Sequence, residues 1–170
     1  MSEAPWTEAM LIERLRTRYN LDLGNGPAWA FARHVANDAG FGKTRTLDAV
    51  AMSLHPSKGC ALHGFEVKVT RGDWRRELAD PTKAAAFTEH LDYFWVVAPP
   101  GVVPVAELPS AWGLMETSGA GLRVKHQADA LRPVVSWFGG NPVRSAPVDR
   151  GFVACLLRAS TRKPQLAGTP

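Results

Sequence analysis

A continuous apolar run near the middle of the chain limits the folds that are open to it. Residues 93–98 read YFWVVA and are followed at once by Pro99-Pro100-Gly101, which end the run. A short apolar run bounded by turn residues is typical of a strand that is covered on both faces. The run therefore predicts a central strand, with other elements packed against both faces of its sheet.

Three further segments show the alternation of a strand: residues 29–35, for which a helix is the rival interpretation, 44–54 and 61–70. Residues 55–60 (HPSKGC) contain proline and glycine, which predicts a hairpin connection between the second and third of these strands. In the third strand Glu66 and Lys68 share one face, because successive side chains point to opposite faces. This charged pair interrupts an otherwise apolar strand.

Helices are expected on either side of these strands. Thr7 can cap a helix over residues 8–19, in which apolar residues recur at helical spacing. Residues 73–78 look helical, and a second piece begins at Asp80 as N-cap with Pro81 at the first helical position. Residues 112–117 and 122–127 predict a closing hairpin, and 151–160 a final short helix. The predicted class is α/β in the broad sense (α+β), with one domain over 1–160 and a flexible tail over 161–170.

Composition fits one ordinary globular domain. The 170 residues are 45% hydrophobic and 21% charged, which argues against a disordered chain. No apolar run reaches the roughly 18 to 20 residues that a membrane span needs. Two cysteines without metal or disulfide spacing favour a reduced, cytoplasmic protein. The net charge of +4 is compatible with a polyanionic partner but does not decide for one.

Asp48, Glu66 and Lys68 are the strongest candidates for chemistry. They lie in the two strands joined by the predicted hairpin, so the right register sets Asp48 opposite the other two. Two carboxylates on a half-buried face repel one another, and a divalent cation resolves that conflict. Mg²⁺ prefers such hard oxygen ligands, and Lys68 can orient an attacking water or offset charge on phosphorus. The alternative is a surface hairpin that carries an ordinary cross-strand ion pair.

The residues around this trio resemble a known family. Asp48 followed by Glu66-Val67-Lys68, set in TLDAVAMSL and GFEVKVT and followed by a helix, resembles the PD-(D/E)XK nuclease superfamily. The run RGDWRRELADPTKAAAFTEHLDYFWVVAPPG is similar to small phage and bacterial members linked to DNA repair. The resemblance spans residues 7–127. Leu47 stands where the family motif has proline, which is a tolerated variation.

The resemblance implies a restriction-endonuclease-like core, a central mixed sheet flanked by helices in the order α-β-β-β-α-β, followed here by the C-terminal hairpin and short helix. It implies Mg²⁺, with Mn²⁺ as a substitute, and cleavage of DNA in repair, recombination or phage DNA processing. It assigns catalysis to Asp48, Glu66 and Lys68, and counts Asp48, Glu66 and Val67 among the metal ligands. The alternative function is a catalytically inactive nucleic-acid-binding module. The oligomeric state, a homodimer included, is left open.

A further acidic ligand is expected from the first helix, as in many members of that superfamily. At about 100° per residue, Glu8 falls within the apolar stripe that faces the core, whereas Glu13 projects away from it. We therefore predict Glu8 as the additional metal ligand. The alternative is an acidic residue that is favourably placed at a helix N-terminus.

Positive side chains follow Lys68 closely and are candidates for a rim that tracks a phosphate backbone: Arg71, Arg75, Arg76 and Lys83. Arg71 and Arg75 lie nearest the site in sequence. The alternative is a solvated helix face with internal ion pairs. We interpret Trp74 as a core residue rather than a base-stacking one, and His34 and His63 as packed or hydrogen-bonded side chains rather than metal ligands.

Overall fold

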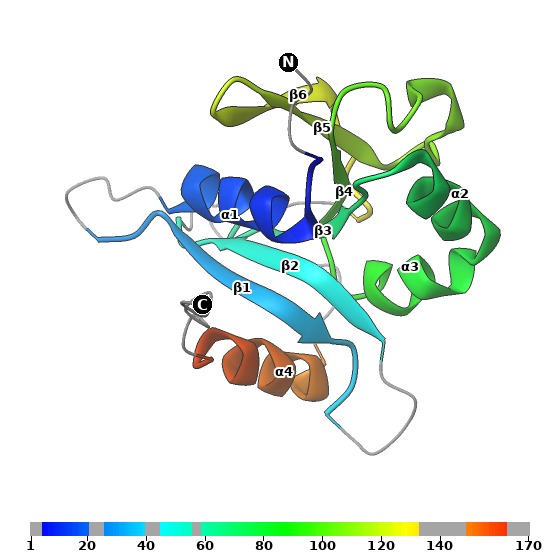
Figure 1. The fold of residues 1–170 in the computed structure, drawn as a ribbon. Helices are drawn as coiled ribbons and strands as arrows, with labels where there is room; N and C mark the ends of the chain where they lie inside the picture. The colour runs from blue at the N-terminus through cyan, green and yellow to red at the C-terminus, as the bar shows by residue number, and fades with distance from the viewer. Residues whose placement is uncertain (1–4, 21–25, 40–44, 56–58, 133–148, 163–170) are drawn as a thin grey trace, which may run out of the picture.

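The computed structural model describes residues 5–20, 26–39, 45–55, 59–132 and 149–162. It is an α+β structure with a six-stranded mixed sheet flanked by helices (Figure 1). The elements are α1 (Glu8–Tyr19), β1 (Trp29–Ala36), β2 (Thr46–Ser53), β3 (Leu62–Val67), α2 (Arg71–Ala79), α3 (Pro81–Thr88), β4 (Tyr93–Ala98), the 3-10 helix η2 (Val105–Glu107), β5 (Gly113–Ser118), β6 (Gly121–His126) and α4 (Arg150–Ser160). Within the described ranges, no helix has both the length and the apolar character needed to cross a membrane.

The strands lie in the sheet in the order of the sequence, from β1 to β6. β1, β2 and β3 form an antiparallel meander, β3, β4 and β5 run parallel, and β6 returns antiparallel to β5. β4 therefore lies inside the sheet, and its residues from Phe94 to Ala98 are all buried. This confirms the central strand that the run YFWVVA predicts.

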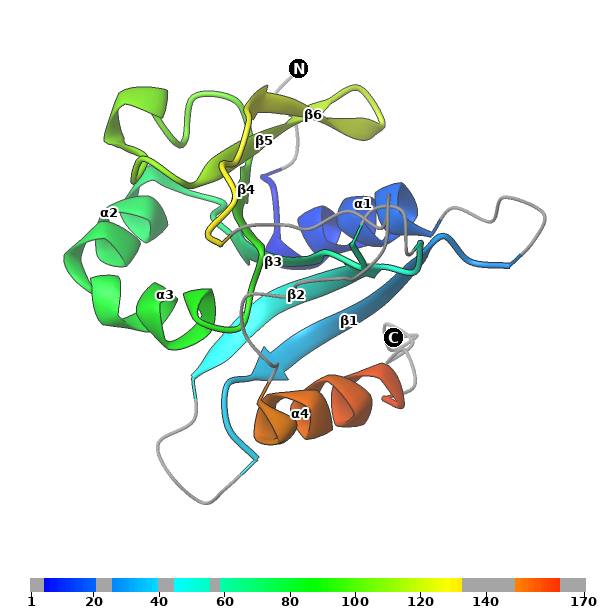
Figure 2. The same cartoon turned by 180° about the vertical axis from the view of Figure 1, so that it is seen from behind.

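Helices cover both faces of the sheet. Figures 1 and 2 show α1 on one face of β1 and β2 and α4 on the opposite face, with α2 and α3 beyond β3. One apolar core joins the buried stripe of α1 to residues of β2, β3 and β4, among them Ala49, Phe65 and Val97. A second core, on the other face, joins α3 and α4 to Val50 and Phe94.

Local signals in the sequence explain most of the boundaries. Thr7 caps α1, since its hydroxyl accepts a hydrogen bond from the N–H of Met10 at 3.3 Å. Residues 29–36 form a strand, so the helical alternative for this segment is wrong. The closing hairpin is present as β5 and β6, and the final helix begins one residue before its predicted start.

Three expectations need correction. The third strand ends at Val67 rather than Thr70, because Thr70 and Asp73 form a capping box that starts α2. Asp80 occupies the N-cap position of α3, but its carboxylate binds Arg45 and Thr82 and makes no cap hydrogen bond. The order that the resemblance implies has one helix between the third and fourth strands, whereas the structure has two, α2 and α3, as the two helical pieces in the sequence predict. Of the predicted tail, residues 163–170 lie outside the described part of the chain.

A glycine in β3 lets two leucine side chains approach the sheet closely. A Cβ atom on Gly64 would lie 2.3 Å from Cδ1 of Leu91 and 2.8 Å from Cδ2 of Leu47. Both distances are too short for any larger residue at this position. Gly64 therefore lets Leu91 and Leu47 pack directly on β3, two residues before Glu66.

Candidate active site

Asp48 is positioned where β2 and β3 part. The ladder between these strands ends with the pair Ala49 and Phe65, which sets Asp48 opposite Glu66 in the same register. Beyond that pair, the N–H of Val67 donates to Oδ2 of Asp48 at 2.7 Å. A side chain thus replaces the backbone acceptor at the end of the ladder, and the carboxylate is fixed against the main chain of β3.

Glu66 and Lys68 meet at the end of β3. Lys68 lies just beyond the strand, and its N–H still donates to the carbonyl of Val97 at 2.9 Å. Its Nζ atom lies 2.9 Å from Oε2 of Glu66. Both side chains are almost entirely buried, at 9% exposed for Lys68 and 1% for Glu66. The structure therefore brings together the pair that strand alternation places on one face.

Glu77 and Lys83, from α2 and α3, complete a group of four charges. Oε2 of Glu77 lies 2.6 Å from Nζ of Lys68 and 3.4 Å from Nζ of Lys83. Lys83 also approaches Oε2 of Glu66 at 2.7 Å. Sequence reasoning assigned Lys83 to DNA contact and missed Glu77. The available signal for Glu77 was that it lies three residues after Trp74, because residues at that spacing share a helix face.

Helix α2 is held in place by several contacts near its start. Trp74 is completely buried, and its Nε1–H donates to Oε2 of Glu107 at 2.9 Å. The same glutamate pairs with Arg71. Since Thr70 caps the helix directly after β3, these contacts fix the direction of α2. Glu77, one turn after Trp74, is then directed at the buried end of Lys68.

A second group forms on the α1 side of Asp48. Glu8, His34 and Asp48 each offer one ligand atom, and these atoms all lie within 4.8 Å of one another. Glu8 is therefore near Asp48, whereas Glu13 pairs with Arg16 on the exposed side of α1. The interpretation of His34 as a packed side chain is wrong, because His34 is exposed and lies in this group.

His34 reaches this position through an irregularity in β1. The ladder pairs Arg33 with Ala49 and Val35 with Leu47, so His34 and Asp48 stand opposite one another between these pairs. The φ angle of His34 is +50°, in the left-handed region that non-glycine residues seldom adopt. Alternation in the sequence gives no sign of this local change, which is why His34 was not foreseen.

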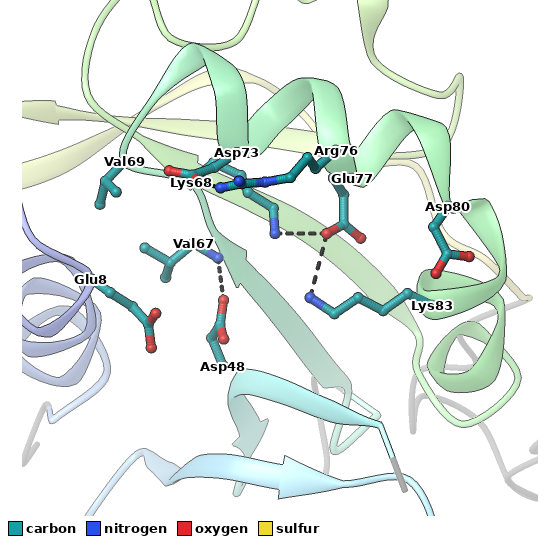
Figure 3. A pocket seen from close by; sticks show the side chains of 10 residues that line it. All are labelled: Glu8, Asp48, Val67, Lys68, Val69, Asp73, Arg76, Glu77, Asp80 and Lys83. Carbon is teal, nitrogen blue, oxygen red and sulfur yellow. Dashed lines mark hydrogen bonds and ion pairs between the residues drawn. The ribbon is translucent and has the colours of Figure 1, made fainter. Parts of the chain in front are cut away.

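Most of these charged residues, though not Glu66 or His34, line a pocket of about 420 Å³ (Figure 3). Its walls are Glu8 from α1, Asp48 from β2, Val67, Lys68 and Val69 from the end of β3, and Asp73, Arg76, Glu77, Asp80 and Lys83 from α2 and α3. Figure 3 shows the carboxylates of Glu8 and Asp48 on one side and the Lys68, Glu77 and Lys83 group on the other. The pocket is thus polar, and carries both signs of charge.

Burial dominates the electrostatics of the carboxyl groups. It raises the pKa of Glu66 to about 7, with repulsion from Asp48 adding to the shift and Lys68 and Lys83 opposing it. Burial also raises the pKa of Asp48, although the Val67 N–H works against this. For Lys68, burial alone would lower the pKa, but Glu66 and Glu77 outweigh it and raise the pKa above its ordinary value. Lys68 is therefore charged.

Of the four predicted phosphate-contact residues, two line the pocket and two do not. Arg76 and Lys83 line the pocket, and the side chain of Arg76 is 81% exposed. Arg75 is exposed on α2. Arg71 is held by Glu107 in a two-pronged contact. Proximity in sequence favoured Arg71, but the helical phase of α2 directs Arg76 to the pocket.

The structure also tests the interpretations of Trp74 as a core residue and of His63 as a packed or hydrogen-bonded side chain. Trp74 is a core residue, as expected, because its side chain is completely buried. His63 is packed and hydrogen-bonded, with its Nδ1 accepting from Nε1 of Trp95 at 3.1 Å. Neither residue lines the pocket.

Comparison with known proteins adds information on the fold. No family model matches the sequence, and no curated protein matches it. Among solved structures, the chain is similar to the SPO1766 protein of unknown function from Silicibacter pomeroyi, with a TM-score of 0.54 and 14% identity. That match covers 94% of this chain and 85% of the other. At this identity the likeness shows a shared fold, and the site must be interpreted from its own geometry.

Proposed function

We propose that this protein is a metal-dependent DNA nuclease with a restriction-endonuclease-like core. The observation that carries the proposal is that Asp48 and Lys68 line one polar pocket while the buried Glu66, opposite Asp48 in the register, pairs with Lys68. A half-buried and a buried carboxylate beside an ammonium group are costly for a fold to keep unless they serve chemistry. The same three residues carry the resemblance to the PD-(D/E)XK superfamily.

The donor atoms of the site fit a divalent cation. Oε1 of Glu66 is buried and has no hydrogen-bond partner among the described residues. Asp48 and Glu8 add carboxylate oxygens, His34 adds an imidazole nitrogen, and Val67 lines the same pocket. Oxygen-rich sets of this kind suit Mg²⁺ and Mn²⁺. A cation held there would polarise a phosphodiester and lower the pKa of an attacking water.

The protein's own residues supply position and charge. The Val67 N–H binds Oδ2 of Asp48 and so limits the orientations of this carboxylate, which lines the pocket. The ammonium group of Lys68 is fixed at the pocket wall and can stabilise charge that develops on phosphorus. Arg76 and Lys83 line the wall on the α2 and α3 side and can bind the neighbouring phosphates of a DNA strand.

DNA is the substrate that the charge of the chain favours. The net charge is +4, and Arg76 of α2 and Lys83 of α3 line the pocket. Phosphate contacts of this kind supply the sequence-independent part of DNA binding. They also predict that binding weakens as salt rises.

The test is cleavage of plasmid and oligonucleotide DNA with Mg²⁺ or Mn²⁺, compared with EDTA. We expect cleavage by the wild type with metal and none with EDTA. Asp48→Asn keeps the acceptor for the Val67 N–H but removes a ligand charge, and should abolish cleavage and weaken metal binding in calorimetry. Asp129→Asn, at an exposed position, is the matched control. A wild type that binds DNA but cuts it under no metal condition would instead be an inactive binding module.

A further inference from the structure

We infer that Glu77 is a positioning residue that holds the ammonium group of Lys68 in the pocket. This inference rests on the proposed nuclease function for its meaning, although the contact itself does not depend on it. Neither the resemblance nor the comparisons assign a role to Glu77. It extends the site from the strands β2 and β3 to the helix α2.

The contacts of Lys68 carry the inference. Its Nζ atom lies 2.6 Å from Oε2 of Glu77 and 2.9 Å from Oε2 of Glu66. The helix residue is thus the nearer of the two partners. The Glu77 side chain is only 3% exposed, so water does not compete for Lys68 from that side. Lys68 is held between a strand and a helix that approach it from different directions.

A lysine needs such support to act at a defined point. Its side chain is flexible, with a rotamer entropy that opposes any single placement. Glu66 alone cannot supply the support, because the same carboxylate also receives Lys83 at 2.7 Å and is itself a candidate metal ligand. Glu77 keeps Lys68 anchored whatever else Glu66 binds. Lys83, 3.4 Å from Glu77, offsets the second buried negative charge.

The arrangement is a poor device for stability alone. Buried ion pairs repay their desolvation only when the remaining hydrogen-bonding positions are also satisfied. Here Oε1 of Glu77 is buried and has no partner in the described part of the chain. The fold therefore retains a buried carboxylate with half of its acceptors unused, at the wall of the pocket. This is expected of a residue kept for the geometry of Lys68.

The direct test observes the Lys68 ammonium group by NMR of the lysine Nζ nuclei. Glu77→Gln removes the charge with little change of shape. Glu116→Gln is the matched control, because Glu116 is also buried but lies on β5 and pairs with Arg123 at 3.4 Å. We expect an ordered Lys68 signal in the wild type and the control, and its loss through faster motion and exchange in Glu77→Gln. An unchanged Lys68 signal in Glu77→Gln would overturn the inference.

Cleavage kinetics provide the second readout. Misplacing a reacting group by about 1 Å can cost on the order of 100-fold in rate. We expect Glu77→Gln to lower kcat about 10- to 100-fold and to change KM for DNA less than about twofold. Glu77→Asp keeps the charge and should retain more of kcat than Glu77→Gln does. Equal losses in the two variants, or a loss confined to KM, would refute a positioning role.

The two experiments separate two kinds of failure. If the wild type cuts no DNA, the proposed function is wrong, and the NMR comparison still decides whether Glu77 holds Lys68. If the wild type cuts DNA and Glu77→Gln cuts it equally well, the proposed nuclease function is supported and the positioning role of Glu77 is refuted. Thermal melting of each variant shows whether it is folded. If Glu77→Gln is unfolded, Glu77→Asp takes its place in both experiments.

Discussion

The two ends of strand β3 surround their ionisable side chains in different ways, with a half-buried histidine at one end and a buried glutamate at the other. Near its start, His63 stacks on Tyr93 with ring centroids 4.6 Å apart and accepts a hydrogen bond from Trp95. Burial lowers the pKa of His63 to about 4, so the ring is neutral. Near its end, Glu66 lies against two ammonium groups, and burial raises its pKa to about 7.

The difference supports the Glu66 end as the candidate for binding. At the His63 end the fold removes the charge and gives the ring nitrogen a partner, which is the economical way to bury a titratable group. At the Glu66 end it keeps several charges and leaves Oε1 of Glu66 and of Glu77 without hydrogen-bond partners among the residues that the structure describes. Perturbed, incompletely satisfied charges in a pocket are typical of functional sites. We therefore call the His63 end of β3 the structural end and the Glu66 end, where the proposed site lies, the chemical end.

The largest expected effect comes from removing a charge at the chemical end. Lys68→Met leaves Glu66 and Glu77 with only the partly exposed Lys83. Breaking a buried pair in this way typically costs about 3 to 5 kcal/mol. We expect a loss of that size in the free energy of unfolding at pH 8, measured with urea, together with the loss of cleavage.

The control for Lys68→Met is Lys125→Met, at an exposed position of β6. The loss caused by Lys68→Met should also shrink at pH 5. The pKa of Glu66 is already about 7 in the wild type, and without Lys68 it is expected to rise further, so Glu66 takes up a proton there. A loss below about 1 kcal/mol at pH 8 would be the size of a surface pair and would contradict the interpretation of these charges as buried and coupled.

At the structural end, the effect appears as a dependence on pH. The pKa of His63 is about 4 in the fold against 6.5 ordinarily, so between these values the unfolded chain binds a proton that the folded protein does not. Stability from this residue is therefore present above pH 6.5 and lost as pH falls to 4, by about 3 kcal/mol. His63→Phe should lack this loss. Urea titrations at pH 4.5 and 7 measure it, and equal pH slopes in both proteins would refute it.

How far the sequence predicts this molecule depends on the range of each signal. The central strand follows from YFWVVA, and α1 from Thr7 and its apolar stripe, because these patterns are local. Glu66 and Lys68 are likewise adjacent by strand alternation. Helical phase places Glu8 rather than Glu13 beside Asp48. All of these features follow from the side-chain periodicity within a single helix or strand.

The rest depends on how elements meet. Glu77 joins the site only because the capping box at Thr70 starts α2 directly after β3 and Trp74 fixes its direction. His34 joins it because its own backbone is in the left-handed region, which nothing in the alternation of residues 29–35 reveals. Both depend on tertiary packing or on one backbone angle. A single-sequence pattern carries neither kind of information.

His34 yields a smaller prediction about the choice of metal. Imidazole nitrogen is a better ligand for Mn²⁺ and later transition metals than for Mg²⁺. If the cation is held between Asp48, Glu8 and His34, His34→Ala should weaken Mn²⁺ binding about tenfold and Mg²⁺ binding less. Calorimetric titration of both ions measures this, with His126→Ala as control. Equal effects on the two metals would show that the imidazole is not a ligand.

The smallest expected effect concerns the exposed arginines at the chemical end. Arg76 lines the pocket and its side chain is 81% exposed, so we expect it to contact a DNA phosphate. Removing one such contact lowers the slope of log affinity against log salt by about 1 and weakens binding a few-fold. Fluorescence anisotropy with an oligonucleotide at several salt concentrations measures both for Arg76→Ala. Arg16→Ala is the control, since Arg16 pairs with Glu13 on the outer side of α1. Equal slopes in the two variants would mean that DNA does not follow α2 beside the pocket, and the polar end of β3 would then need another partner.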